Sequence, residues 1–217
     1  MIDRDIARQR LTRHLELTGI RDQRVLQAIQ EVPRDAFVPT GLEEEAYDDR
    51  PLPIGEGQTI SQPYVVALMA QEARLRPNDR VLEVGTGSGY AAAVFSRVAS
   101  EVFTIERLPS LASLARERLA ELGYDNVHVR EGDGTLGWPD AAPFDAILVA
   151  AGGPEPPAAL KRQLAIGGRL IIPVGDTPAE QRLVRVIRRN GKFDLHDLGA
   201  VRFVPLVGQE GWSERGR

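Results

Sequence analysis

A run of glycines with an acid in front of it is the segment best suited to bind a small ligand. Residues 81–90 read VLEVGTGSGY, which places one carboxylate ahead of three alternating glycines: Glu83, Gly85, Gly87 and Gly89. Glycines that follow a strand allow a ligand to approach the backbone, and ligands of open α/β sheets bind outside the carboxyl ends of the strands. The spacing G-x-G-x-G differs from the G-x-G-x-x-G of dinucleotide sites, and the lysine of a phosphate-binding P-loop is missing.

Two further acids follow this loop in the sequence. Glu106 ends the next apolar run, EVFTIE, where a carboxylate can accept hydrogen bonds from both hydroxyls of a ribose. Asp133 lies in EGDG at residues 131–134, after another apolar run, and can accept a hydrogen bond from an adenine amino group. Glycines and acids together suit a cofactor that carries an amine and a sulfonium but no phosphate. We therefore expect S-adenosylmethionine.

A second polar segment precedes the glycine loop. Residues 55–64 read GEGQTISQPY and carry three hydroxyl groups, on Thr59, Ser61 and Tyr64, ahead of the apolar run VVALM. Ser61 is expected to be the N-cap of the following helix, with Pro63 in its first turn. The free amides of a helix N-terminus also favour an anion. The segment therefore predicts both a helix start and a site for a carboxylate.

The elements that position these residues are strands alternating with helices. Apolar runs predict strands over residues 80–84, 101–106, 126–133, 144–151 and 168–175, with helical segments between them. This alternation predicts a parallel sheet covered on both faces. Three later runs are expected to be closing strands, partly antiparallel: QRLVRVIRR, KFDLHDLGAV and RFVPLV.

The first 50 residues read as helical. Two amphipathic helices are expected, broken near Gly19, with core positions Ile6, Leu11, Leu15, Val25, Leu26 and Ile29. The chain is thus expected to be one doubly wound, Rossmann-like α/β domain over residues 1–217. Its parts are a helical cap with an active-site segment (1–60), a cofactor-binding core (61–175) and closing strands (176–217).

Composition excludes several classes of function. The net charge of −4, without a block of basic residues, disfavours nucleic-acid binding. There is no cysteine, so disulfides, thiolate metal sites and a cysteine nucleophile are excluded. The three histidines lack the spacing of metal ligands, so no metal is expected. No apolar run suits a membrane span or a signal peptide, and the expected location is the cytoplasm. Nothing in the sequence specifies an oligomeric state.

Over nearly its full length the chain resembles the protein-L-isoaspartate O-methyltransferases. The resembling segments are VPRDAFVP, AYDDRPLPIGEGQTISQP, VLEVGTGSGY, EGDG, GWPDAAPFDAI, QLAIGGRLIIPVG and RFVPLVG. GQTIS is the specific segment, because the glycine loop alone would indicate only a class I methyltransferase. The resemblance implies methyl transfer from S-adenosylmethionine to the free α-carboxylate of L-isoaspartyl residues in damaged proteins and peptides, with S-adenosyl-L-homocysteine as product.

The resemblance also implies roles for individual residues. Thr59 and Ser61 would bind the substrate carboxylate as catalytic residues, and Val207 would close the pocket. The expected cofactor-binding set is Gln58, Thr59, Ile60, Ser61, Glu83, Gly85, Gly87, Gly89, Glu106, Arg107, Asp133 and Gly134. Tyr64 is a departure, since several members have His at this position. Its expected contribution to substrate binding is either a hydroxyl donor or packing.

Three other readings stay open at this point. The first is a class I methyltransferase with a small-molecule or nucleic-acid substrate, although AAGGPEPP lacks the [DN]-P-P-[YFW] clamp of many amino-methylating enzymes. The second is a binding module that keeps the fold without catalysis, which would bind the cofactor but transfer no methyl group. The third is an NAD-dependent reductase, disfavoured by the glycine spacing and by the absence of an obvious Tyr-x-x-x-Lys pair.

Overall fold

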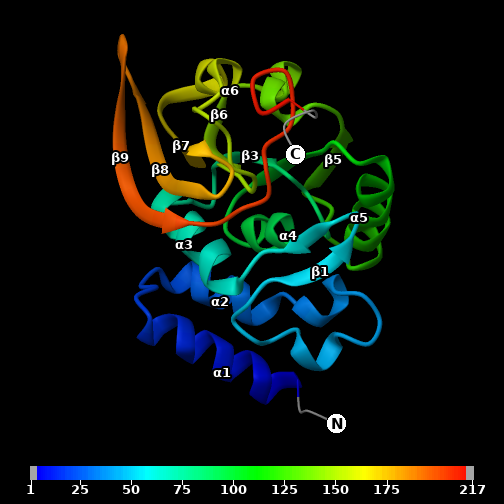
Figure 1. The fold of residues 1–217 in the computed structure, drawn as a ribbon. Coiled ribbons are helices and arrows are strands. Elements are labelled where there is room, and N and C mark those ends of the chain that lie inside the picture. Colours follow the sequence, from blue (N-terminus) through cyan, green and yellow to red (C-terminus); the bar gives the residue numbers. More distant parts are fainter. Residues whose placement is uncertain (1–3, 214–217) are drawn as a thin grey trace.

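A twisted sheet with helices on both sides forms the centre of the molecule (Figure 1). The structure is a computed structural model and describes residues 4–213. Within that range the sheet has seven strands in the order β5-β4-β3-β6-β7-β8-β9. They are β3 (Arg80–Val84), β4 (Glu101–Glu106), β5 (Val127–Glu131), β6 (Phe144–Val149), β7 (Leu164–Thr177), β8 (Glu180–Arg189) and β9 (Lys192–Val201). β3 to β7 pair in parallel, whereas β8 and β9 are antiparallel, as expected.

The central strands are buried on both faces, which explains their unbroken apolar sequences. Alternate residues of β3 enter different apolar clusters: Val81 packs with the side that contains the cap, and Leu82 with the opposite side. The covering helices are α3 (Pro63–Ala73), α4 (Tyr90–Ser96), α5 (Pro109–Glu121) and α6 (Ala158–Gln163). The prediction of a mostly parallel, doubly wound sheet is confirmed.

Strand order reverses beside β3. The chain passes from β3 to β4 and β5 on one side, and then returns to place β6 on the other side of β3. Such a reversal opens a crevice at the carboxyl ends of the strands, where open α/β sheets bind ligands. The glycine loop lies directly after β3 and therefore at this point.

The N-terminal cap consists of α1 (Arg4–Leu17) and α2 (Gln23–Glu31), at the bottom of Figure 1. The break near Gly19 is confirmed. The predicted core positions are buried except Ile6, which is 46% exposed, so that assignment was wrong. The second helix ends at Glu31, just before Pro33, and two short 3-10 helices follow, η1 (Arg34–Phe37) and η2 (Glu43–Glu45).

Two segments differ from the expected elements. A short antiparallel hairpin, β1 (Leu52–Gly55) and β2 (Gln58–Ile60), occupies the stretch expected to be an irregular polar turn. Residues 202–207 form no regular strand, contrary to expectation, and make only isolated bridges such as Gly152 with Pro205. Proline has no N–H for a ladder, which limits pairing here.

The boundaries expected at residues 60 and 175 fall at the end of β2 and inside β7. No helix within residues 4–213 has the length and apolar character needed to cross a membrane.

Candidate active site

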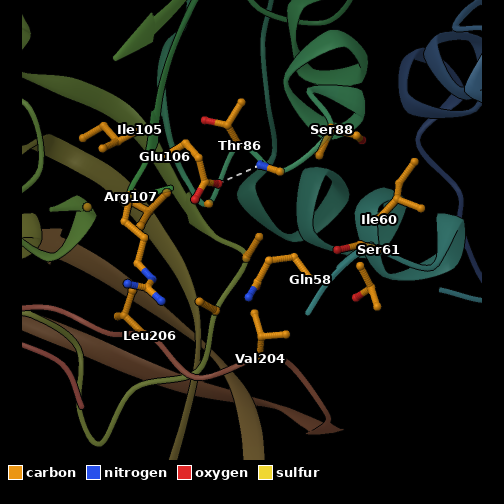
Figure 2. Close-up of a pocket in the computed structure, with 18 of the residues that line it drawn as sticks. Gln58, Ile60, Ser61, Thr86, Ser88, Ile105, Glu106, Arg107, Val204 and Leu206 are labelled. Carbon is orange, nitrogen blue, oxygen red and sulfur yellow. Dashed lines mark hydrogen bonds between the residues drawn. The ribbon is translucent and has the colours of Figure 1, made fainter. Parts of the chain in front are cut away.

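A cavity lies at the reversal of strand order. Figure 2 shows Glu106 and Arg107 on one side of it and Gln58 and Ser61 on the other. Its walls come from four segments: β2 and Ser61, the glycine loop with the start of α4, the ends of β4 and β6, and the C-terminal segment. The predicted site residues in this lining are Gln58, Thr59, Ile60, Ser61, Gly85, Gly87, Glu106, Arg107, Gly134 and Val207.

The glycine loop forms the floor between β3 and α4. Gly87 lines the cavity with φ of +52°, a conformation that L side chains adopt at a cost, and its N–H donates to Glu106 Oε2 at 2.9 Å. Gly89 lies outside the lining and is the N-cap of α4. A Cβ there would sit 3.2 Å from Leu119 Cδ1, so the structure gives Gly89 a role in packing α4 against α5.

Glu106 presents a carboxylate to the cavity at the end of β4. Its side chain is almost fully buried, and its oxygens accept hydrogen bonds from the amides of Gly87 (2.9 Å) and Leu108 (3.0 Å). An ionised carboxylate has about four acceptor positions, so this group retains capacity for two ligand hydroxyls. That matches the pair of hydroxyls of a ribose.

Glu83, predicted to bind the cofactor, does not line the cavity. It is buried below the loop, where Glu83 Oε2 accepts from Thr104 Oγ1 at 2.5 Å and Thr104 Oγ1 lies 2.6 Å from Thr86 Oγ1. Burial raises the pKa of Glu83 to about 8, and the nearby Glu106 adds to the rise. Thr104 therefore links the neutral carboxyl group of Glu83 to Thr86, which does line the cavity.

Asp133 also lies just outside the lining, whereas its neighbour Gly134 is in it. Asp133 Oδ1 accepts from the amide of Thr135 at 2.9 Å, and Oδ2 accepts from the amide of Gln209 at 2.7 Å. A Cβ on Gly134 would collide with Val84, so only glycine fits between β3 and the cavity at this point. Asp133 thus fastens the C-terminal segment beside the cavity, and its contact with adenine stays a prediction.

A second, more open groove adjoins the cavity on the side of α3. Tyr64, Val65 and Leu68 of α3 form one wall, and residues 198–204 form the other. Both hollows are lined by Thr59 and Ser61, together with Ala150 and Val204. The two hydroxyl side chains therefore lie on the wall that the cavity and the groove share. Tyr64 both lines the groove and packs against the core.

Ser61 is not the N-cap of α3, which corrects the prediction from the sequence. The cap residue is Gln62, and no side chain of its own caps the helix; Pro63 is the first helical residue, as expected. Asp49 accepts the hydrogen bond of the Tyr64 amide at 2.8 Å instead. Within the described residues the hydroxyls of Ser61 and Thr59 make no hydrogen bond, so both are available to a ligand.

Several lining residues were missed from the sequence. The hydroxyls of Thr86 and Ser88 lie within the recognised glycine loop, and spacing alone did not single them out. Val204, Pro205 and Leu206 precede the predicted Val207, and together they form a wall. Backbone bonds hold this wall, with Gly152 N donating to Val204 O and Leu206 N donating to Gly152 O, both at 2.8 Å.

The lining fits S-adenosylmethionine better than a nucleotide phosphate. It offers an acidic group for ribose hydroxyls, apolar side chains (Val84, Ile105 and Leu206) for a purine ring, and neutral hydroxyls near the groove. Arg107 is the one cation among the described lining residues, and no lysine is present there. Residues 4–213 hold no cluster of three or more His, Asp or Glu that could bind a metal ion.

Comparison with known proteins agrees with this geometry. The family model of protein-L-isoaspartate(D-aspartate) O-methyltransferase matches residues 6–211. A protein-L-isoaspartate O-methyltransferase 1 of Geotalea uraniireducens is 60% identical over 200 residues, covering 92% of this chain and 91% of the relative.

Two solved structures extend the comparison. A protein-L-isoaspartate O-methyltransferase superposes with a TM-score of 0.87 at 31% identity, covering 94% of this chain and 67% of that one. A methyltransferase of the same description from Plasmodium falciparum, in complex with S-adenosyl-L-homocysteine, gives a TM-score of 0.79 at 28% identity, covering 91% and 96%. The chain described here belongs to the protein-L-isoaspartate(D-aspartate) O-methyltransferase family.

Proposed function

We propose that this chain is a protein-repair enzyme that methylates the free α-carboxylate of L-isoaspartyl residues in damaged proteins and peptides, with S-adenosylmethionine as methyl donor. The single observation that carries the site assignment is the shared wall: Thr59 and Ser61 line both the cavity and the groove. A carboxylate bound in the groove at these hydroxyls is directed toward the cavity. We also propose a cytoplasmic location for the enzyme.

The cavity residues would hold the cofactor as follows. Glu106 accepts the ribose hydroxyls, Gly85 and Gly87 allow its amino-acid part to approach the backbone, and the segment around Gly134 borders the adenine. S-adenosylmethionine supplies a methyl group on a sulfonium, which leaves as a neutral thioether.

Glu106→Ala is expected to weaken binding of S-adenosyl-L-homocysteine by about 1–3 kcal/mol, because hydrogen bonds to a charged group are lost. Titration calorimetry on the folded variant measures this, and Glu106→Gln, which keeps one acceptor oxygen, should lose less. An affinity equal to that of the wild type in Glu106→Ala would remove this residue from the cofactor site.

The reaction requires the protein to orient the reacting groups, and it requires no general acid or base. A substrate α-carboxylate, with a pKa near 3.5, is ionised at neutral pH and needs no base. No histidine or lysine is among the described residues that line the cavity and the groove. Thr59 and Ser61 would donate hydrogen bonds that fix one carboxylate oxygen, a proximity effect. The amide nitrogen of the next residue attacks the resulting ester and expels methanol, which closes an imide, and hydrolysis of the imide by water returns a fraction of the molecules to normal aspartate.

The decisive test uses two peptides of one sequence that differ only in Asp against isoAsp. We expect methyl transfer from labelled S-adenosylmethionine to the isoAsp peptide and none above background to its Asp twin. Equal transfer to both peptides, or transfer only to a small molecule or a nucleic acid, would contradict the proposed substrate. A chain that binds the cofactor and methylates neither would be a binding module.

A further inference from the structure

Arg34 is a buried arginine directly behind the proposed carboxylate site. It opens η1, within the sequence VPRDAFVP, and it is fully excluded from solvent. Its Nη2 donates to the carbonyl oxygen of Ser61 at 3.0 Å, and its guanidinium carbon lies 5.5 Å from the centre of the Tyr90 ring. Ser61 and Tyr90 both line the cavity. The guanidinium is thus separated from the cavity by a single layer of residues.

The hydrogen bonds of Arg34 hold the chain on both sides of the β1–β2 hairpin. Nη1 donates to the carbonyl of Ala46, and Nη2 also donates to the carbonyl of Arg50 at 3.0 Å. The three acceptors lie at residues 46, 50 and 61, on both sides of the β1–β2 hairpin. One side chain therefore fixes both ends of the hairpin that carries Thr59.

No carboxylate pairs with this charge in the described part of the chain. The nearby Asp48 pairs with Arg50, Asp35 pairs with Arg4, and Asp49 binds the Tyr64 amide and His14. Asp48 and Asp49 act on Arg34 only through space, and burial lowers the pKa of Arg34. An arginine nonetheless stays protonated in proteins. A buried cation bound only to neutral carbonyls leaves positive potential for an anion nearby.

Two other arginines face the same region. Arg107 lines the cavity and Arg202 lines the groove. Arg34 differs because it acts through the peptide between Ser61 and Gln62. A trans peptide directs its N–H opposite to its C=O, so the Gln62 N–H points away from the guanidinium. That N–H makes no backbone hydrogen bond within the described residues and is polarised by the charge at the other end of its peptide.

We propose that Arg34 is a positioning residue for the substrate carboxylate: it fixes Ser61 from behind, and its unpaired positive charge selects an anionic group at the hydroxyl wall. This inference rests on the proposed function. It also accounts for a site that binds an anion through neutral hydroxyls. The charge attracts the carboxylate without forming a direct ion pair, which would withdraw electron density from the attacking oxygen.

The test compares two competitive peptide ligands in the presence of S-adenosyl-L-homocysteine. One carries isoaspartate, and the other carries isoasparagine, in which a neutral amide replaces the carboxylate. The quantity measured is the ratio of their dissociation constants, amide over acid. In Arg34→Gln we expect this ratio to fall about tenfold or more, because a charge within several ångströms is lost, while the affinity for S-adenosyl-L-homocysteine stays at the wild-type level.

Arg169→Gln is the matched control. Arg169 also binds backbone carbonyls, those of Ala73 and Arg74, but it lines neither the cavity nor the groove. This variant should lose stability and keep the wild-type ratio. Arg34→Lys keeps the charge and loses the planar fork, so it should keep the ratio and lower kcat about tenfold through a less ordered Ser61.

A wild-type ratio in Arg34→Gln would overturn the proposal and leave Arg34 a structural residue. Where Arg34→Gln does not fold, Arg34→Lys decides: loss of acid preference in a variant that keeps the charge would overturn it equally. A wild-type enzyme that methylates isoAsp without preferring the acid over the amide would overturn it too. A wild-type enzyme that does not methylate isoAsp would instead contradict the proposed function.

Discussion

Ser61 shows how a single residue can be assigned correctly to a site for a partly wrong reason. Its place before Pro63 suggested a helix cap that also touches a ligand. The structure gives the capping role to Asp49, which accepts a hydrogen bond from the Tyr64 amide, and leaves the Ser61 hydroxyl facing the cavity and the groove. Because the Ser61 hydroxyl makes no hydrogen bond within the described residues, its removal should lower activity without lowering the stability of the fold.

Ser61→Ala is therefore expected to lower turnover of an isoAsp peptide roughly 30- to 1000-fold, the effect of losing a donor that orients the reacting group. The free energy of unfolding should change by less than about 0.5 kcal/mol, because no cap is lost. Peptide kinetics and chemical denaturation on one preparation measure both. Thr59→Val should act in the same direction and more weakly.

Ser113→Ala, on the exposed face of α5, serves as the control and should leave both quantities unchanged. Ser61→Ala with wild-type turnover would remove the hydroxyl from the reaction.

At the scale of the element, the start of α3 depends on a contact made across the fold. Asp49 binds the amide of Tyr64 and the side chain of Gln62, so a loop of the cap sets where the helix begins. Since Ser61 lies immediately before this helix, a shift of the helix start would also move the hydroxyl wall.

Asp49→Ala should lower the free energy of unfolding by about 1–2 kcal/mol, the usual cost of losing a helix cap. It should also lower turnover of isoAsp peptide. Asp22→Ala is the matched control, because Asp22 caps α2 by accepting from the Arg24 amide at 3.0 Å, away from the site. Denaturation curves should show similar losses for both, with turnover reduced only in Asp49→Ala; equal turnover in the two variants would contradict the link between cap and site.

The elements that could be predicted from the sequence are the strands that are buried on both faces. β3, β4 and β6 are buried on both faces, and a continuous apolar run reports that burial directly. The β1–β2 hairpin was missed because Pro53, Gly55 and Gly57 interrupt any alternation. The run RFVPLV has strand-like composition, but Pro205 cannot donate to a ladder and the segment crosses the strand ends instead. The capping role of Asp49 could not be predicted from a local sequence pattern, because the Tyr64 amide that it binds lies fifteen residues later in the chain.

Within the site, the sequence correctly placed several residues in the lining of the cavity. Gly87, Glu106 and Ser61 lie where their local sequence suggested. Glu83 and Asp133 did not, since their carboxylates turn away to Thr104 and to the amide of Gln209. Spacing places an acid at a strand end, but the tertiary partners of that acid decide which way it points.

At the scale of the whole molecule, one buried acid should govern how stability depends on pH. Burial raises the pKa of Glu83 from 4.5 to about 8, so the native state holds a proton that the unfolded chain releases between these values. The unfolded state binds fewer protons there, and stability must fall as the pH rises through this window. Above it the contribution is constant.

Glu83→Gln should abolish this fall. The variant should be more stable than the wild type by about 3–5 kcal/mol near pH 9 and much closer to it near pH 5, since each unit of pKa shift corresponds to about 1.4 kcal/mol. Denaturation across this range measures the slope. Glu117→Gln, an exposed position on α5, should keep the wild-type slope. A parallel pH dependence in Glu83→Gln would show that another group carries the proton.

The cavity wall at residues 204–207 has a consequence for biosynthesis. A ribosome releases these residues after all the strands of the sheet, yet they supply Val204, Pro205, Leu206 and Val207 to the lining, and the amide of Gln209 fastens them to Asp133. A chain whose synthesis stops before residue 204 would therefore have every strand of the sheet and lack this wall of the cavity.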